Sequence, residues 1–519
     1  MTPKKMNGAE SLIRTLVASG VEVCFTNPGT SEMHFVAALD KVEGMRAILG
    51  LFEGVVTGAA DGYARIAEKP AATLLHLGPG LANGLANLHN ARRAASPIVN
   101  IVGDHASYHA QYDPPLASDI VGFARPVSAW IHSSRSSLTV AADGARAVQA
   151  ARQAPGQIAT LILPADTAWL DADFPAPPLP VQGPAPAAPA AMDLAAETLR
   201  NGRKSAILIR GAGLKRRGLE AAGRIAAKTG CRLLCDTLTP RLERGAGVVA
   251  VERIPYFAEQ IVDFVKDLEQ IVLVGAKPPV AFFAYPGKPS WCLPEGCRIV
   301  YLAQEHEDGP AALEALAAAL GAPKEPAGRA EFKDPGLPTG EFNPYTIGQA
   351  IAHFLPENAI ISDEAATSAT GAMLYLAGAH PHDHLSITGG SIGQGLPVAT
   401  GAAVAGAGRK VVCPHGDGGA MYTLQALWTQ ARENLDVTTV IFANRSYRIL
   451  KVELGRVGAD APGPKALSSL DLNNPDLDWV HLAKGMGVEA SRAEKIEDFV
   501  AQFSSAMKQR GPRLIEAVI

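Results

Sequence analysis

Short apolar runs alternate with helical patterns along most of the chain, and this alternation predicts parallel β-sheets covered by helices. Near the start, residues 71–77, 97–103 and 158–164 are apolar runs typical of buried strands, and residues 80–94 have a helical pattern. Later runs predict strands at 205–211, 231–237, 270–276, 297–303, 359–364, 410–418, 438–444 and 512–519. The pattern therefore predicts the α/β class.

Two segments rich in proline, alanine and glycine interrupt this alternation, at residues 173–192 and 321–344. Such a composition cannot build a core and is typical of linkers. Residues 1–172, 193–320 and 345–519 are then separate units, in keeping with about 150 residues per domain. We expect three doubly wound parallel-sheet domains.

Composition excludes several classes of protein. Apolar residues make up 47% of the chain and charged residues 19%, as in ordinary globular proteins. The net charge of −4 provides no basic surface for nucleic acid. No apolar run reaches the roughly 18 residues of a membrane span, and the start lacks the apolar core of a signal peptide. The six cysteines form no CxxC pair, so we expect a reduced, cytoplasmic protein without a zinc site.

The strongest chemical signal is at the end of the apolar run at 410–418, where Gly416, Asp417 and Gly418 are followed by Gly419. A second apolar run ends in Asn444, 27 residues after Asp417. Because parallel strands end at one edge of a sheet, these two oxygen donors should converge there. Oxygen ligands suit Mg²⁺, and glycines before a helix N-terminus allow a diphosphate to approach. The segment therefore predicts a magnesium-diphosphate site.

This spacing resembles the thiamine diphosphate (ThDP) motif, which begins GDG and ends NN. Ala443 replaces the first of the two final asparagines, so the resemblance makes Asn444 the metal ligand and adds the carbonyl of Ser446. Further matches in order are residues 25–32, 50–65, 74–87 and 386–401. Nearly the whole chain thus resembles ThDP-dependent 2-keto acid decarboxylases and acetolactate synthases, with benzoylformate decarboxylase-like and acetolactate synthase large-subunit-like enzymes as the best match.

The resemblance assigns the cofactor's pyrimidine to the first domain and its diphosphate to the third, with a central domain between them. Glu53 would be the activating acid that favours the imino tautomer, from which the ylid forms. In the glycine-rich segment, the carbonyl of Gly390 would meet the pyrimidine amino group, beside Ser391. Ile392 would bend the cofactor into its V shape.

The substrate pocket implied by the resemblance contains His76, Thr30, Leu116 and Glu453. His76 would bind the substrate carboxylate or relay a proton, and Thr30 would replace a serine. The stretch 276–287 contains no histidine where benzoylformate decarboxylase has its second one. Alternative proton donors are His105 and His109.

The resemblance implies an enzyme that decarboxylates a 2-keto acid to an enamine and ligates it to a second carbonyl compound, as acetolactate synthase does. Alternatives are a simple decarboxylase that releases an aldehyde, a 2-hydroxyacyl-CoA lyase, and a cofactor-binding regulatory paralogue. A nicotinamide or flavin oxidoreductase is the rival enzyme class. The glycines of residues 209–218 are spaced GxGx₄G rather than GxGxxG, and FAD is not expected.

Subunit assembly also follows from the resemblance. The two ends of the cofactor would rest on different subunits, so the active site would require a homodimer. A homotetramer, formed as a dimer of dimers, is the expected assembly.

Overall fold

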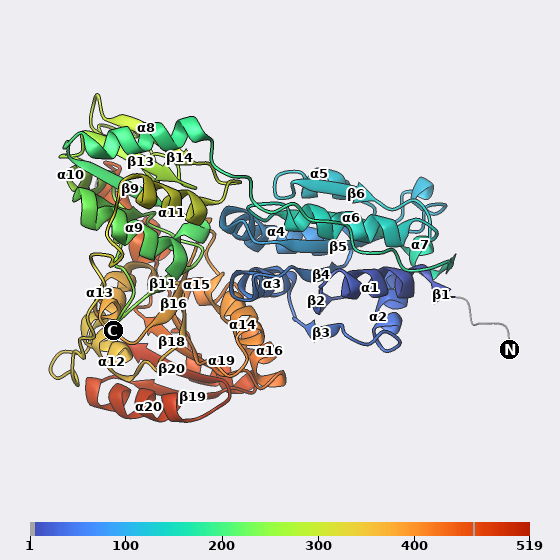
Figure 1. The fold of residues 1–519 in the computed structure, drawn as a ribbon. Coiled ribbons are helices and arrows are strands. Elements are labelled where there is room, and N and C mark those ends of the chain that lie inside the picture. The colour runs from blue at the N-terminus through green and yellow to red at the C-terminus, as the bar shows by residue number, and fades with distance from the viewer. Residues whose placement is uncertain (1–5, 460–461) are drawn as a thin grey trace.

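The computed structural model describes residues 6–459 and 462–519. Figure 1 shows three sheets, each enclosed by helices, and the prediction of three doubly wound domains is confirmed. The amino-terminal sheet is parallel, in the order β3-β2-β4-β5-β7-β6. Its strands are β2 (Val23–Asn27), β3 (Arg46–Leu49), β4 (Ala71–Leu75), β5 (Ile98–Asp104), β6 (Trp130–Ser133) and β7 (Ile158–Pro164).

Helices cover both faces of this sheet. One buried cluster joins it to α1, α2, α6 and α7, and another joins it to α3, α4 and α5. These helices are α1 (Gly8–Ala18), α2 (Met33–Leu39), α3 (Glu53–Ala67), α4 (Leu77–Ala94), α5 (Ile120–Ala124), α6 (Val140–Arg152) and α7 (Ala165–Trp169). Two 3₁₀ turns lie at η1 (Thr30–Glu32) and η2 (Ala110–Tyr112). The pairing of β1 (Met6–Asn7) with β8 (Asp171–Ala172) brings the ends of the domain together.

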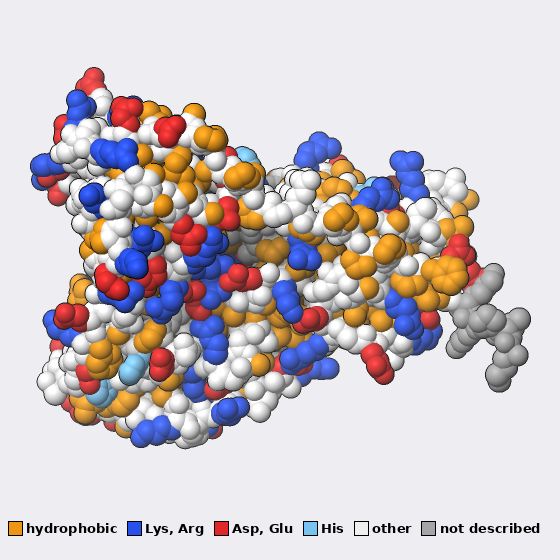
Figure 2. Space-filling model, in the orientation of Figure 1, with side chains coloured by type: hydrophobic (Ala, Val, Ile, Leu, Met, Phe, Trp, Pro, Cys, Tyr) orange, Lys and Arg blue, Asp and Glu red, His pale blue; other side chains and the backbone are white. Residues whose placement is uncertain are grey.

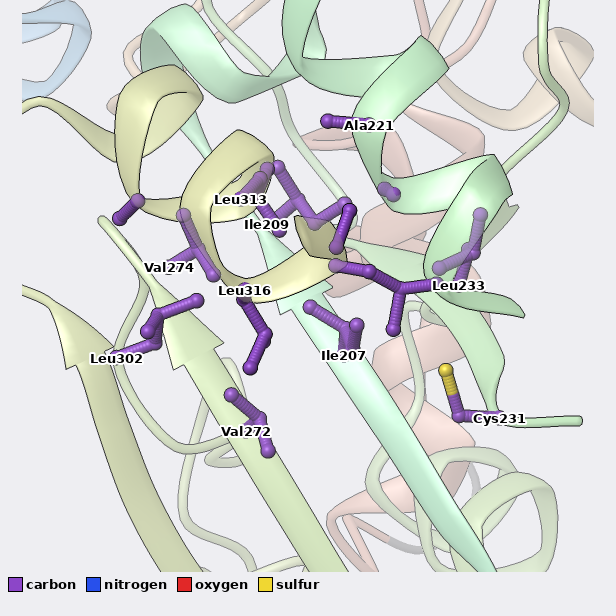
Figure 3. Packing of buried hydrophobic residues seen from close by; sticks show 14 of the residues in the cluster. Ile207, Ile209, Ala221, Cys231, Leu233, Val272, Val274, Leu302, Leu313 and Leu316 are labelled. Atoms are coloured by element: carbon purple, nitrogen blue, oxygen red, sulfur yellow. The ribbon is translucent and has the colours of Figure 1, made fainter. Parts of the chain in front are cut away.

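The central domain contains a parallel sheet in the order β12-β10-β9-β13-β14. Its strands are β9 (Ser205–Ile209), β10 (Arg232–Cys235), β12 (Glu252–Arg253), β13 (Gln270–Val274) and β14 (Arg298–Ala303). Its helices are α8 (Pro189–Arg200), η3 (Gly211–Leu214), α9 (Arg216–Thr229), α10 (Ala258–Val265) and α11 (Gly309–Ala319). In Figure 3, Ile207 and Val272 on the strands face Leu313 and Leu316 of α11, and this apolar contact fixes the helix to the sheet.

The carboxy-terminal sheet has seven strands in the order β11-β16-β15-β17-β18-β20-β19. They are β11 (Leu242–Arg244), β15 (Ile360–Asp363), β16 (His382–Ser386), β17 (Val411–Gly416), β18 (Val437–Ala443), β19 (Glu489–Ala493) and β20 (Arg513–Val518). Strand β11 precedes this domain in the chain and pairs antiparallel with β16. The central segment is therefore tied to the third domain by backbone hydrogen bonds.

Two buried clusters again cover opposite faces of this sheet, one involving α14, α16 and α19 and the other α12, α13 and α20. The elements are α12 (Pro344–Phe354), η4 (Ala366–Ser368), α13 (Ala369–Leu374), η5 (Tyr375–Ala377), α14 (Gly395–Ala405), α15 (Asp417–Ala420), α16 (Ala426–Arg432), α17 (Arg448–Arg456), α18 (Pro464–Ser468), α19 (Trp479–Gly485) and α20 (Ile496–Lys508). Glycines let α3 and α14 pack backbone to backbone: a Cβ on Gly401 would lie 1.8 Å from the carbonyl oxygen of Ala59.

Each apolar run predicted as a strand overlaps a strand of the structure. The proline-rich segment after residue 172 becomes helical earlier than expected, because α8 begins at Pro189. Proline is compatible with the first helical position, where no N–H is needed. None of the described helices is both long enough and apolar enough to cross a membrane.

Candidate active site

Glu53 is the first residue of α3, which starts four residues after β3 ends. Its side chain is largely buried, with 8% of the residue exposed. Asn83 of α4 donates a hydrogen bond from Nδ2 to Oε2 at 3.0 Å, and no described residue donates one to Oε1. A Cβ at Gly80 would lie 3.3 Å from Oε1, so only a small residue fits beside this oxygen. The carboxylate of Glu53 is therefore held through Oε2, and Oε1 is available to a ligand.

His76 follows β4 and caps α4. Its Nδ1 lies 2.8 Å from Oε2 of Glu32, a carboxylate whose residue is only 1% exposed. The Gly29 N–H and the Ser31 hydroxyl also donate to Glu32, at 2.7 and 2.8 Å. A carboxylate facing Nδ1 places a proton on that nitrogen, which leaves Nε2 as the working atom.

Sequence reasoning missed Glu32, although it lies inside the recognised segment 25–32. The available signal for Glu32 was an acid next to a turn, but the local sequence does not show that this acid is buried. Gly103 on β5 makes room for it, because a Cβ there would be 1.6 Å from Oε1 of Glu32. A strand distant in the chain thus creates the space for this carboxylate.

The other pocket residues predicted in this domain are not gathered around His76. Thr30 is exposed at the start of η1, whereas the hydroxyl of the next residue, Ser31, lies 3.3 Å from Nδ1 of His76. Leu116 is exposed on the loop before α5. His105 and His109 pack ring to ring with centroids 5.7 Å apart, and no described interaction joins either to His76.

Asp417 begins α15, directly after β17, and Asn444 directly follows the neighbouring parallel strand β18. The N–H groups of Gly418 and Arg445 donate to the two carboxylate oxygens of Asp417 at 2.8 and 2.6 Å. The N–H of Ser446 donates to Oδ1 of Asn444 at 3.0 Å. Asp417 is therefore bonded to the turn that carries Asn444 and Ser446. Burial raises the pKa of Asp417, and these N–H donors offset part of the increase.

The donors on these two loops fit Mg²⁺ better than a softer ion. They are a carboxylate, an amide oxygen and a backbone carbonyl, which are all hard oxygen ligands. The described chain contains no group of three His, Cys, Asp or Glu side chains placed to hold a metal. This does not conflict with the set above, since Asp417 is its only acid.

The glycine-rich segment after β16 has an unusual backbone. Gly390 and Gly393 have φ angles of +74° and +92°, which L side chains rarely adopt. The buried Glu364, directly after β15, accepts hydrogen bonds from the N–H groups of Gly393 and Gly395, both at 2.6 Å. Ile392 directly precedes the anchored Gly393, and its apolar side chain is partly exposed.

A second buried ion pair supports this segment. Nε2 of His415 lies 3.3 Å from Oε2 of Glu364, and its Nδ1 lies 3.0 Å from the carbonyl oxygen of Gly416. Burial opposes the charged imidazole, but the charge of Glu364 outweighs it and raises the pKa of His415. Glu364 and His415 were not predicted as site residues. A lone acid and a lone histidine in buried runs were the available signals.

Within one chain, α4 links the first domain to the glycine-rich segment: Nδ2 of Asn87 donates to the carbonyl oxygens of Gly54, next to Glu53, and of Gly393, at 2.7 and 3.4 Å. Asn90 of α4 exchanges hydrogen bonds with the backbone of Ser391, at 2.7 and 3.2 Å. Asn83, the partner of Glu53, lies seven residues earlier on the same helix, a rise of about 10 Å. Among the described residues no hydrogen bond joins Glu53 to Gly390 or to Asp417.

The segment 276–287 places an aromatic ring beside Gly390. A Cβ on Gly390 would lie 3.0 Å from the ring of Phe282, and this ring packs against Tyr256 with centroids 5.0 Å apart. The buried Glu453 of α17 is next to this cluster. Burial, followed by the charge of Glu453, raises the pKa of Tyr256 to about 12. Arg456 approaches Glu453 with its Nε 3.3 Å from Oε2.

Comparisons with known proteins identify the family of the chain. The amino-terminal TPP binding domain of thiamine pyrophosphate enzymes matches residues 6–122, and the carboxy-terminal TPP binding domain matches residues 366–517. The chain is 52% identical to the Mycobacterium tuberculosis protein named "Putative acetolactate synthase large subunit IlvX", over 99% of both chains. It is 29% identical to benzoylformate decarboxylase of Pseudomonas aeruginosa, over 96% of both chains.

Solved structures share the fold. The ThDP-dependent 4-hydroxybenzoylformate decarboxylase of Rhodococcus jostii RHA1 superimposes with a TM-score of 0.85 at 23% identity, over 99% of both chains. The benzoylformate decarboxylase of Polynucleobacter necessarius gives a TM-score of 0.83 at 20% identity, again over 99% of both chains. The chain belongs to the thiamine pyrophosphate enzyme family, and it is a ThDP-dependent enzyme related to acetolactate synthases and benzoylformate decarboxylases.

Proposed function

We propose that the protein uses ThDP and Mg²⁺ to remove CO₂ from a 2-keto acid and to join the remaining acyl unit to a second carbonyl compound. The observation that carries this proposal is the contact of Phe282 with Gly390. Release of an aldehyde needs a proton donor near the reacting carbon, and a phenyl ring cannot supply one. The similarity to a relative named as an acetolactate synthase large subunit supports the same choice.

Cofactor binding is assigned to both outer domains. ThDP, when bound, supplies a carbon nucleophile and an acceptor for the electrons released with CO₂. Asp417, Asn444 and the carbonyl of Ser446 would hold the magnesium ion. Gly416, Gly418 and Gly419 would bind the diphosphate, and Ser391 and the carbonyl of Gly390 would bind the pyrimidine. Ile392 would support the cofactor with its exposed side chain.

Glu53 and His76 are the residues assigned to proton transfer. Oε1 of Glu53 would be available to hydrogen-bond the pyrimidine of the cofactor, while Asn83 fixes Oε2. His76 keeps its Nδ1 proton toward Glu32 and offers Nε2 to the substrate. Thr30, Leu116 and Glu453 would line the substrate pocket, as the resemblance to the family implies. The same resemblance places the two ends of the cofactor on different subunits, so the working site would be formed in a homodimer or a dimer of dimers.

The second candidate function is simple decarboxylation to an aldehyde. The His76–Glu32 pair favours it, because a histidine oriented by a buried carboxylate can take up and deliver a proton at Nε2. The two functions share substrate and cofactor and differ only in the fate of the acyl unit.

Product analysis separates the two. The protein is incubated with ThDP, Mg²⁺ and a panel of 2-keto acids, and aldehydes are separated from acyloins and acetohydroxy acids. We expect carboligation products to dominate, and Phe282→His to raise the aldehyde fraction by adding a proton donor. The matched control is Phe283→His, since the ring of Phe283 packs on Phe282 without contacting Gly390. Aldehyde as the main product of the unmodified protein would establish the second candidate instead.

A further inference from the structure

A cavity of about 420 Å³ lies where β11 joins the carboxy-terminal sheet, outside the residues assigned to ThDP. Acidic and basic side chains gather on this face of the molecule, over the region of β11 and β16 (Figures 1 and 2). The charged residues of its wall are four arginines and two acids: Arg216, Arg241, Arg244, Arg409, Glu243 and Asp383. Positive charge therefore exceeds negative charge in this cavity.

Two of the four arginines use the available carboxylates. Nε of Arg241 and Nη2 of Arg409 both lie 2.6 Å from Asp383. Glu243 accepts a hydrogen bond from the backbone N–H of Arg216 at 2.8 Å and lies 3.5 Å from Arg241. Both acids of the wall are thus engaged.

The other two guanidinium groups form no ion pair with an acid among the described residues. Arg216 reaches only the carbonyl oxygen of Gly247, at 3.4 Å. The backbone of Arg244 pairs with His382 in the sheet, but its guanidinium makes no side-chain hydrogen bond in the described part of the chain. Burial and the neighbouring charge of Arg253 lower the pKa of Arg244 to about 10, although the charge of the nearby Asp363 opposes this shift, so the guanidinium is still charged near neutral pH. A partly buried charge without a partner is costly unless a ligand pairs with it.

A buried histidine at the same wall also lacks a partner. His382 is 4% exposed, and its Nδ1 lies 2.7 Å from the carbonyl oxygen of His380, which places the proton on Nδ1. Its Nε2 is buried and has no hydrogen-bond partner. Burial, together with the charge of Arg244, lowers the pKa of His382 to about 3, so Nε2 is an acceptor for a donor group of a ligand.

We propose that this cavity binds a small hydroxylated phosphate ester. Arg216 and Arg244 bind the phosphoryl oxygens, which suit the planar, forked donors of guanidinium. Nε2 of His382 accepts a hydrogen bond from a hydroxyl group. The volume lies within the roughly 300–1,000 Å³ of typical small-molecule sites. Because the wall combines β11 with β16, an occupant pairs charges contributed by the central and carboxy-terminal segments.

The test uses the protein loaded with saturating ThDP and Mg²⁺, so that the diphosphate site is already filled. Ribose 5-phosphate, inorganic phosphate and ribose are titrated separately by calorimetry and by thermal unfolding. Ribose 5-phosphate is expected to bind most tightly and to raise Tm, inorganic phosphate to bind more weakly, and ribose not to bind. Preference for inorganic phosphate over the ester would overturn the assignment of an ester, as would the absence of saturable binding.

Variants then locate the binding. Arg244→Met is expected to weaken binding of ribose 5-phosphate at least about tenfold, as loss of a charged hydrogen bond requires. Tm without ligand should stay level or rise, because an unpaired charge is removed. Arg217→Met is the matched control, since Arg217 follows Arg216 in the chain but pairs with Glu314 on the surface. Unchanged binding by Arg244→Met, or a changed subunit assembly, would refute the site. These readouts do not involve turnover, so the cavity proposal can fail without affecting the proposed function.

Discussion

The amino-terminal and carboxy-terminal domains are built on one topology. Six strands in chain order give the spatial order β3-β2-β4-β5-β7-β6 in one domain and β16-β15-β17-β18-β20-β19 in the other, where β11 adds an edge. Both place a buried glutamate after the first of the six strands, Glu32 and Glu364. Each accepts backbone N–H groups and lies next to a histidine from the third strand or its end, His76 or His415.

The two pairs differ in what the histidine can reach. The side chain of His76 is 24% exposed, whereas that of His415 is fully buried. His415 has both ring nitrogens against protein oxygens, from Glu364 and Gly416. In His76, Nδ1 faces the Glu32 carboxylate, and Nε2 has no hydrogen-bond partner among the described residues. The same Glu–His pairing thus serves architecture in one domain and is available for chemistry in the other.

The largest effect should come from Glu53→Gln, which tests whether proton chemistry belongs to the amino-terminal domain. Glutamine keeps the shape and the bond to Asn83 but cannot exchange a proton, so turnover should fall by about 10³-fold. The Kd for ThDP, measured by calorimetry, should stay within about threefold. Glu43→Gln, at an exposed acid, is the control. Turnover equal to the control would show that another acid activates the cofactor.

Substitution of His415 by leucine should act on stability. It removes one member of a buried pair and leaves Glu364 with its backbone donors only, which should cost about 3 kcal/mol of unfolding free energy. Chemical denaturation measures this loss. Turnover at saturating ThDP should change less than about threefold, because the side chain of His415 is fully buried and is not accessible to a substrate. A large loss of turnover with unchanged stability in the His415 variant would show that His415, like His76, takes part in the chemistry.

His76→Ala should lower turnover more than it lowers stability. Removing the ring should slow decarboxylation by about 10²-fold. The loss of unfolding free energy should be smaller than for the His415 substitution, because the ring is partly exposed and Glu32 keeps the Gly29 N–H and the Ser31 hydroxyl as donors. Glu32→Gln should slow decarboxylation by about tenfold, because the ring keeps its place but loses the negative charge that orients it. Steady-state rates of CO₂ release measure both. If Glu32→Gln alone reproduced the full loss, the carboxylate rather than the imidazole would carry the chemistry.

The sequence predicted the parts of this comparison that depend on local pattern. Apolar runs located the strands, and the spacing of Asp417 and Asn444 indicated neighbouring strand ends, because parallel strands finish at one edge. Glu32 and Glu364 escaped notice since their burial depends on glycines far away in the chain, Gly103 among them. Strand β11 has three residues, and its Leu242 pairs with His384, 142 positions later, which no local pattern encodes.

The smallest effect concerns which hydroxyl assists His76. The sequence placed Thr30 in the catalytic pocket, in place of a serine. In the structure Thr30 is exposed, and the hydroxyl of the next residue, Ser31, lies 3.3 Å from Nδ1 of His76 and donates to Glu32. Ser31→Ala should therefore slow turnover about threefold to tenfold, the scale of one hydrogen bond of roughly 1 kcal/mol. Thr30→Val keeps the size of the side chain and is the matched control, with an expected change below about twofold. Rates of CO₂ release under identical conditions decide between them. A larger loss from Thr30→Val would mean that this hydroxyl binds substrate once the second subunit closes the pocket.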